Sequence, residues 1–196
     1  MKRKMQQSAV CALGMMLLLC LPTMAAQSQQ SQQRQSQVRD ETTARVMAGI
    51  SREVRHELLM LPYYGVFDWL EYEVRPDDTV VLRGQVTRPT TKSAAEDRVE
   101  DIEGVAKVIN EIEVLPVSPN DDRLRVALYR AIYSGPLFRY AVGSLNTIHI
   151  IVENGRATLK GWVNSEADKQ LAYTRARGVS GLFEVKNELR VEKSEG

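Results

Sequence analysis

Apolar residues recur along this chain with two different periods. In four segments the spacing is three or four residues, which places apolar side chains on one face of a helix. These four stripes consist of Ile50, Val54 and Leu58; Ala95, Val99 and Ile102; Leu124, Leu128 and Ile132; and Ala172, Ala176 and Val179. Between the stripes, apolar and polar residues alternate, as they do in strands that bury one face. The pattern therefore predicts four helices packed on sheets.

The alternating segments predict six strands and two hairpins. The strands are expected at residues 70–74, 79–86, 108–114, 148–152, 156–163 and 185–191. Asn154-Gly155 separates two of these runs and is a strong hairpin signal, and Pro76-Asp77-Asp78 separates another two. The order helix–strand–strand–helix–strand occurs twice. The sequence therefore predicts an α+β fold of two tandem small αββαβ domains, each a three-stranded sheet with two helices on one face.

The two domains are copies of one unit. Residues 80–114 and 157–191 match without gaps at about a third of positions, which identifies an internal repeat. Gly84 and Gly161 occupy the same strand position, where glycine indicates a close backbone approach, and we expect the second helix to cross the sheet there. Gly104 and Gly181 follow that helix and suit its end. All four are interpreted as structural glycines, and valine at Gly84 or Gly161 should destabilise the fold by about 1–3 kcal/mol.

The residues shared by the copies form a recognisable pattern. The first copy has Val80, Leu82, Gly84 and Val86, then Gly104, Val105, Val108, Asn110, Ile112 and Val114. The second copy has Leu159, Gly161 and Val163, then Gly181, Leu182, Val185, Asn187, Leu189 and Val191. This pattern resembles the BON domain of bacterial envelope proteins. The resemblance implies an αββαβ fold, an envelope location, no catalysis, and association with phospholipid surfaces or envelope proteins; in related lipoproteins the first helix of the second copy meets anionic lipid.

The N-terminal segment has the pattern of a secretory signal peptide. A basic start at residues 2–4 precedes an apolar run at 10–21, and the small residues that follow suit cleavage near Ala25, which predicts a periplasmic protein. An uncleaved anchor and a lipid-modified Cys20 are the alternatives. The expected organisation is a signal peptide at 1–25, a Gln/Ser-rich disordered leader at 26–40, a first BON domain at 41–115, a linker at 116–120 and a second BON domain at 121–193.

Charge distinguishes the two copies. Without its basic start the chain has 23 basic and 25 acidic residues, a net charge of −2, which does not suit a general nucleic-acid binder. Residues 38–120 contain 10 basic and 16 acidic residues, whereas residues 121–196 contain 12 basic and 9 acidic residues. An anionic surface would therefore attract the second copy.

The first helix of the second copy carries arginines and tyrosines beside its apolar stripe. Aromatic rings settle at headgroup depth in a membrane, while guanidinium groups pair with phosphate. The expected site for anionic phospholipid consists of Arg125, Val126, Tyr129, Arg130, Tyr133, Arg139 and Tyr140. The alternatives are that Tyr129 and Tyr133 pack against the other domain, or that the chain docks on an envelope channel, secretion or cell-wall protein through edge strands or the same helix.

Candidate chemistry is sparse elsewhere. His56 and His149 are isolated from each other and from any cysteine of the mature chain, so no zinc site is predicted. His149 is out of phase with its apolar neighbours and is expected at the surface. The acidic run at residues 96–103 is typical of a solvated helix face. We therefore predict no catalytic residue, metal, cofactor or small-molecule substrate, and the chain is expected not to be an enzyme.

Overall fold

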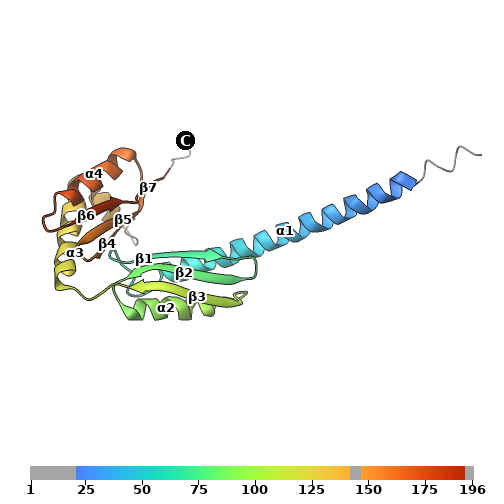
Figure 1. Ribbon diagram of the computed structural model, residues 1–196, viewed down its shortest axis with the longest axis horizontal. Helices are drawn as coiled ribbons and strands as arrows, with labels where there is room; N and C mark the ends of the chain where they lie inside the picture. The colour runs from blue at the N-terminus through green and yellow to red at the C-terminus, as the bar shows by residue number, and fades with distance from the viewer. Residues whose placement is uncertain (1–20, 142–146, 193–196) are drawn as a thin grey trace, which may run out of the picture. The chain divides into compact units, whose positions relative to one another are not determined.

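The computed structural model describes residues 21–141 and 147–192 (Figure 1). The chain divides into two compact units, Met1–Arg45 and Val46–Gly196. The expected signal peptide lies mostly in residues 1–20, outside the described residues. Among the helices of the described residues, none combines the length and the apolar character needed to cross a membrane.

The backbone is helical from Leu21 onward, in helix α1 (Leu21–Leu59). Residues 26–40 were expected to be a disordered leader, and this expectation is wrong for their backbone. The segment between Pro22 and Gly49 contains neither proline nor glycine and is rich in Gln, Ala and Arg, which favour helix. Among the α1 side chains whose burial is described, at residue 34 and from residue 36 onward, Ile50 is the first that is buried.

The first copy continues α1 with β1 (Trp69–Val74), β2 (Thr79–Val86), α2 (Pro89–Glu100) and β3 (Lys107–Val114). The sheet order is β1-β2-β3, with β1 antiparallel and β3 parallel to the central β2. Side chains of α1, α2 and one face of the sheet form a single core, and Figure 1 shows α2 lying along β3. The core residues are Ile50, Val54, Leu58, Leu61, Val80, Leu82, Val86, Ala95, Val99, Ile102 and Ile112. The predicted helix–strand–strand–helix–strand unit is confirmed.

The second copy repeats this arrangement. It comprises α3 (Pro119–Ile132), the 3-10 helix η1 (Gly135–Ala141), β4 (Ile148–Glu153), β5 (Arg156–Val163), α4 (Glu166–Arg177), β6 (Glu184–Asn187) and β7 (Arg190–Val191). Strand β5 is central, with β4 antiparallel to it and β6 and β7 parallel. The sequence pattern did not anticipate η1 or the interruption of the last strand between β6 and β7. The α+β fold of two such units is confirmed.

Local signals in the sequence set the helix starts. The Ser118 hydroxyl accepts a hydrogen bond from the Asp121 amide (3.2 Å) and caps α3. The Ser165 hydroxyl accepts one from the Asp168 amide (3.1 Å) and donates one to the Asp168 carboxylate (2.7 Å), so Ser165 caps α4. Pro89 lies in the first turn of α2, where its missing N–H costs nothing.

Gly84 and Gly161 are structural, but the neighbouring group differs from the one expected. Their φ angles are +131° and +113°, in a region that L side chains rarely adopt. A Cβ at Gly84 would lie 1.9 Å from the Trp69 carbonyl oxygen, and one at Gly161 would lie 1.9 Å from the Thr147 carbonyl oxygen. The close approach is therefore to the backbone of the adjacent strand and not to the second helix.

The repeated asparagine has the same task in both copies. The Asn110 amide donates to the Lys92 carbonyl (3.1 Å) and its side-chain oxygen accepts from the Ile112 amide (3.1 Å). Asn187 makes the equivalent bonds to the Lys169 carbonyl (3.0 Å) and the Leu189 amide (3.3 Å). Each asparagine thus fastens the second helix to the last strand of its copy.

Candidate functional site

Helix α3 presents part of the surface expected from the sequence. Val126 is 43% exposed, Tyr129 is 38% exposed, and Arg130 is also exposed. These residues lie at positions i, i+3 and i+4 and are therefore neighbours on the helix. We call Val126, Tyr129 and Arg130 the α3 surface. Phe138, on η1 just after the helix, is 60% exposed.

Tyr133 does not belong to this surface, and the expectation that it faces outward is wrong. It is only 5% exposed, and its hydroxyl donates a hydrogen bond to the Ile148 carbonyl of β4. Burial and the adjacent Tyr129 raise its pKa well above the usual range, although the bond to Ile148 opposes this. The ring lies 4.9 Å from that of Tyr129, which in turn meets Phe67 of the first copy edge-on at 6.3 Å. Tyr129 therefore packs in part against the first copy, which was one of the alternatives expected from the sequence.

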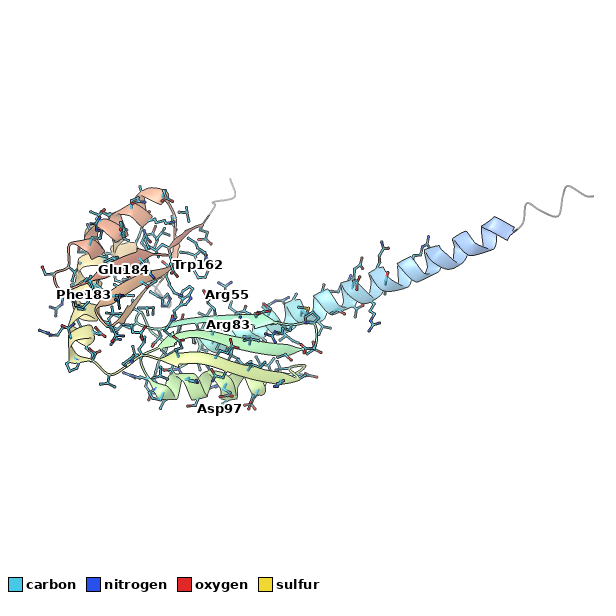
Figure 2. The ribbon with its side chains drawn as sticks, in the orientation of Figure 1. Arg55, Arg83, Asp97, Trp162, Phe183 and Glu184 are labelled. Atoms are coloured by element: carbon cyan, nitrogen blue, oxygen red, sulfur yellow. The ribbon has the colours of Figure 1, made fainter. Side chains whose placement is uncertain are left out.

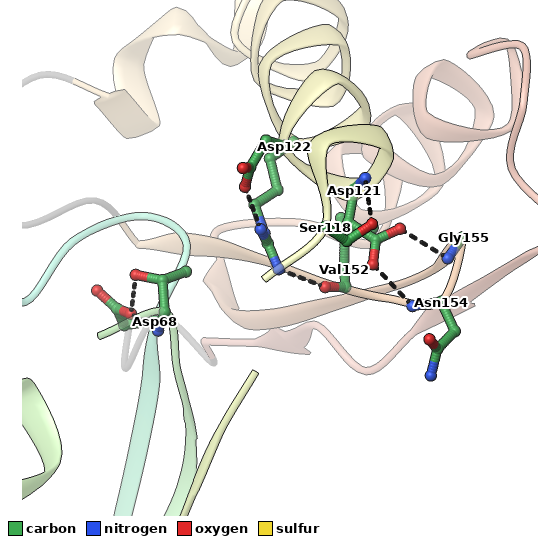
Figure 3. A network of polar contacts seen from close by, with 9 residues as sticks. Asp68, Ser118, Asp121, Asp122, Val152, Asn154 and Gly155 are labelled. Atoms are coloured by element: carbon green, nitrogen blue, oxygen red, sulfur yellow. Dashed lines mark hydrogen bonds and ion pairs between the residues drawn. The ribbon is translucent and has the colours of Figure 1, made fainter. Parts of the chain in front are cut away.

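Arg125 is likewise buried, with 5% exposure, so its expected outward orientation is also wrong. Its guanidinium group donates to the Val152 carbonyl of β4 (2.7 Å) and to the Asp122 carboxylate (2.5 Å), as Figure 3 shows. Beside it, the buried Asp121 carboxylate accepts bonds from the amides of Asn154 and Gly155, both 2.9 Å (Figure 3). This end of α3 therefore fastens the helix to β4 and its turn.

Tyr140 is also buried, contrary to expectation, whereas Arg139 is half exposed. The Tyr140 hydroxyl donates to the Asp168 carboxylate (2.8 Å) and accepts from the Asn164 amide (2.9 Å). Burial alone would raise the pKa of Asp168, but hydrogen bonds from Ser165, Tyr140 and Arg139 outweigh it, and the pKa is lowered. Arg139 pairs with Asp168 and is therefore less available to an outside phosphate than Arg130.

A second candidate site is a cavity of about 300 Å³ formed by both copies within residues 46–196. Its lining is mainly aromatic and aliphatic: Arg55, Leu58, Leu59, Tyr64, Gly65, Trp69, Leu70, Tyr72, Thr147, His149 and Trp162. Figure 2 labels Arg55 of α1 and Trp162 of β5, which contribute to it from different copies. The volume is at the lower end of the range for small-ligand pockets.

His149 helps to form this cavity, and the expectation of a surface histidine is wrong. It is 7% exposed, its ring lies 5.1 Å from Trp69 and 5.4 Å from Tyr64, and its Nδ1 is 3.2 Å from the Gly65 carbonyl oxygen. The alternation of β4 placed it correctly on the sheet face away from the helices. What the sequence did not reveal is that the first copy covers that face.

Two polar atoms among the cavity residues have no hydrogen-bond partner among the described residues. They are the indole Nε1 of Trp69 and the hydroxyl oxygen of Thr147, and both are buried. Trp69 and Thr147 hold equivalent positions in the two copies, because the Trp69 carbonyl lies against Gly84 and the Thr147 carbonyl lies against Gly161. Sequence reasoning missed the cavity, although both tryptophans of the chain line it; Trp162, out of phase with Gly161 and Val163, was the available signal.

Within residues 21–141 and 147–192, no cluster of three or more His, Cys, Asp or Glu side chains is arranged to hold a metal ion. In the acidic run, Asp97, Glu100, Asp101 and Glu103 are exposed; Figure 2 shows Asp97 on α2.

Comparison with known proteins agrees with this architecture. Residues 48–116 and residues 120–193 each match the BON domain model, so the chain belongs to the BON domain family, whose members are non-catalytic binding domains typical of the periplasm. No curated protein matches the chain.

Two solved structures of CdsD, a structural protein of the type III secretion system of Chlamydia trachomatis, are similar. The C-terminal domain is 12% identical, with a TM-score of 0.30, over 72% of this chain and 96% of that chain. The other is 14% identical, with a TM-score of 0.28, over 74% and 94%. Likeness at this level carries no argument about function.

Proposed function

We propose that this chain is a non-catalytic periplasmic protein that binds anionic phospholipid surfaces weakly through the α3 surface and supports envelope integrity under stress. The observation that carries the proposal is the adjacency of an apolar, an aromatic and a cationic side chain on the exposed face of α3. Such a set can insert a ring at headgroup depth while the arginine pairs with phosphate.

The first copy provides an internal comparison. The apolar stripes of α1 and α3 correspond, so Arg52, Arg55 and His56 of α1 replace the three residues of the α3 surface. All three are exposed and none is apolar. The two copies share a fold but differ at this face, and we assign lipid binding to the second.

Binding should be weak. Three of the seven residues expected to contact lipid are buried, and Arg139 is paired with Asp168. A basic residue near an anionic membrane contributes about 1 kcal/mol. Arg130 and the neighbouring exposed Arg123 therefore provide modest attraction that salt will screen.

The test is co-sedimentation with phosphatidylcholine vesicles that contain or lack phosphatidylglycerol. Tyr129→Ala combined with Arg130→Ala should reduce pelleting with anionic vesicles to the level seen with neutral ones. Arg52→Ala, which removes an exposed cation from the corresponding face of α1, should pellet like wild type. Equal pelleting of the Tyr129/Arg130 variant and wild type would refute the proposal.

A further inference from the structure

The two sheets differ at one edge, at strand β1 in the first copy and strand β4 in the second. In an antiparallel pair, alternate residues direct their backbone groups toward the neighbouring strand and away from it. The Arg75 amide donates to the Thr79 carbonyl (2.9 Å), which continues the β1–β2 pairing. Leu70, Tyr72 and Val74 therefore direct their backbone groups outward.

In the second copy, the equivalent outward residues are Ile148, Ile150 and Val152, because Ile148 pairs with Gly161 as Leu70 pairs with Gly84. All three have partners. Tyr133 donates to the Ile148 carbonyl and Arg125 to the Val152 carbonyl. The Ile150 amide donates to the carbonyl of Val66, in the segment before β1 (2.8 Å). The edge of β4 is thus covered by two side chains and by the carbonyl of Val66, which lies in a turn.

The first copy is covered differently: the Tyr64 side chain hydrogen-bonds the backbone of Leu70, and the helix residues that cover β4 have no counterpart. Matching the apolar stripes of α1 and α3 places Ser51 where α3 has Arg125 and Leu59 where α3 has Tyr133. The Ser51 carbonyl accepts a hydrogen bond from the Tyr72 hydroxyl (2.9 Å). Ser51 therefore contacts the side chain of Tyr72 and not the backbone of β1. Among residues 21–141 and 147–192, we find no partner for the outward backbone groups of Tyr72 and Val74.

The uncovered edge adjoins the aromatic cavity. Trp69, Leu70 and Tyr72 of β1 line it, and Leu59 stands there in place of the covering tyrosine. Two of its lining residues, Trp69 and Thr147, each have a buried polar atom without a hydrogen-bond partner among the described residues. Unpaired backbone beside an apolar cavity suits an extended peptide, whose backbone pairs with the edge while one side chain fills the cavity.

We propose that the β1 edge of the first copy binds an extended segment of a partner protein by strand addition, with a large apolar side chain of that segment in the cavity. A single bond of this kind exists within the chain, where the Val66 carbonyl accepts from the Ile150 amide, the β4 equivalent of the Tyr72 amide. The proposal is independent of lipid binding, which uses the second copy.

The test uses the whole chain and a short capped peptide in which threonine and valine alternate around a central phenylalanine. Binding is followed by NMR, through the indole signals of Trp69 and Trp162 and the solvent exchange of the Tyr72 amide. The peptide should shift both indole signals and protect the Tyr72 amide. Replacing the central phenylalanine by alanine should weaken binding about tenfold or more, because the buried ring is lost.

Two controls separate strand addition from simple cavity binding. A peptide N-methylated at its edge-facing amides keeps its side chains and should not bind. Ser51→Arg combined with Leu59→Tyr places the covers of the second copy in the first and should abolish binding, whereas Met60→Tyr, at an exposed position outside the cavity, should bind like wild type. Circular dichroism checks that both variants fold.

Other occupants give different results, and each would overturn the proposal. Equal binding of the N-methylated peptide would mean that the backbone edge is not used. Indole shifts with decanoate and none with the peptides would indicate a site for a small amphiphile. Protection of the Tyr72 amide that rises with protein concentration without peptide would indicate a second copy of the chain on the edge.

Discussion

Replacing Gly161 by alanine adds one methyl group where the backbone of β4 leaves no space. The new Cβ would lie 1.9 Å from the Thr147 carbonyl oxygen, whereas ordinary contact begins at 3.4 Å, so the atoms must separate by 1.5 Å. The Trp162 amide donates to that same oxygen at 2.8 Å, and the displacement would break this bond.

The expected loss of stability follows from two contributions. Holding alanine at a φ of +113° costs about 1–3 kcal/mol, and overpacking typically costs about 1–3 kcal/mol. We therefore expect Gly161→Ala to lower the free energy of unfolding by about 2–6 kcal/mol, a large part of the 5–15 kcal/mol that is typical of a domain. Gly84→Ala should behave alike, because its Cβ would lie equally close to the Trp69 carbonyl oxygen.

The assay is guanidinium unfolding followed by circular dichroism, with Gly49→Ala as the matched control. Gly49 lies in α1 with no atom within 4 Å of an added Cβ, so alanine there should stabilise the helix by up to about 1 kcal/mol. Unfolding of Gly161→Ala at the wild-type midpoint would refute the reasoning. If valine at position 161 destabilised the protein and alanine did not, the crowding would lie beyond Cβ. That result would favour the expectation from the sequence that the second helix crosses the sheet at this glycine.

Two further predictions concern polar groups that hold each copy together. Asn187→Ala should destabilise the second copy by about 1–3 kcal/mol, because the Lys169 carbonyl and the Leu189 amide lose their partner. As the control, Asn120→Ala at an exposed position should change the free energy of unfolding by less than about 0.5 kcal/mol in the same denaturation assay. Because the folded-state pKa of Asp168 is lowered from 3.8, its carboxylate contributes stability above that pH and loses it as the pH falls further. Wild type should therefore lose more stability than Asp168→Asn between about pH 5 and pH 2, and equal losses in acid-unfolding curves would contradict this assignment.

The order of helices and strands could be predicted because its signals are local. The spacing of apolar residues, the Asn154-Gly155 turn and the Ser165 cap each act within a few residues. The internal repeat supported the same order of elements a second time. The same logic placed the glycines at special backbone positions. It could not say which neighbour approaches them, because the partner strand is remote in sequence.

The lipid-binding face was predicted only in part, for a physical reason. Helical periodicity distinguishes a buried stripe from an outer face. It does not show that the backbone carbonyls of a sheet edge beside the helix need hydrogen-bond donors. Arg125 and Tyr133 border the apolar stripe of α3 and satisfy that need at β4. A buried carbonyl without a partner costs about 1–3 kcal/mol, which explains why these amphipathic side chains turn inward. Val126 and Tyr129 have no such task and remain exposed.

The divergence of the two copies follows from those same positions. With Arg125 and Tyr133 on its helix, the second copy bonds to the backbone of β4, while Val126 and Tyr129 remain exposed on the outer face of α3. With Ser51 and Leu59 there, the first copy keeps a core of the same design, but among the described residues the outward backbone groups of Tyr72 and Val74 have no partner, and Leu59 lines the cavity between the copies. The same two helix positions therefore bond to the sheet edge in the second copy, whereas in the first copy Ser51 contacts the Tyr72 side chain and Leu59 lines the cavity.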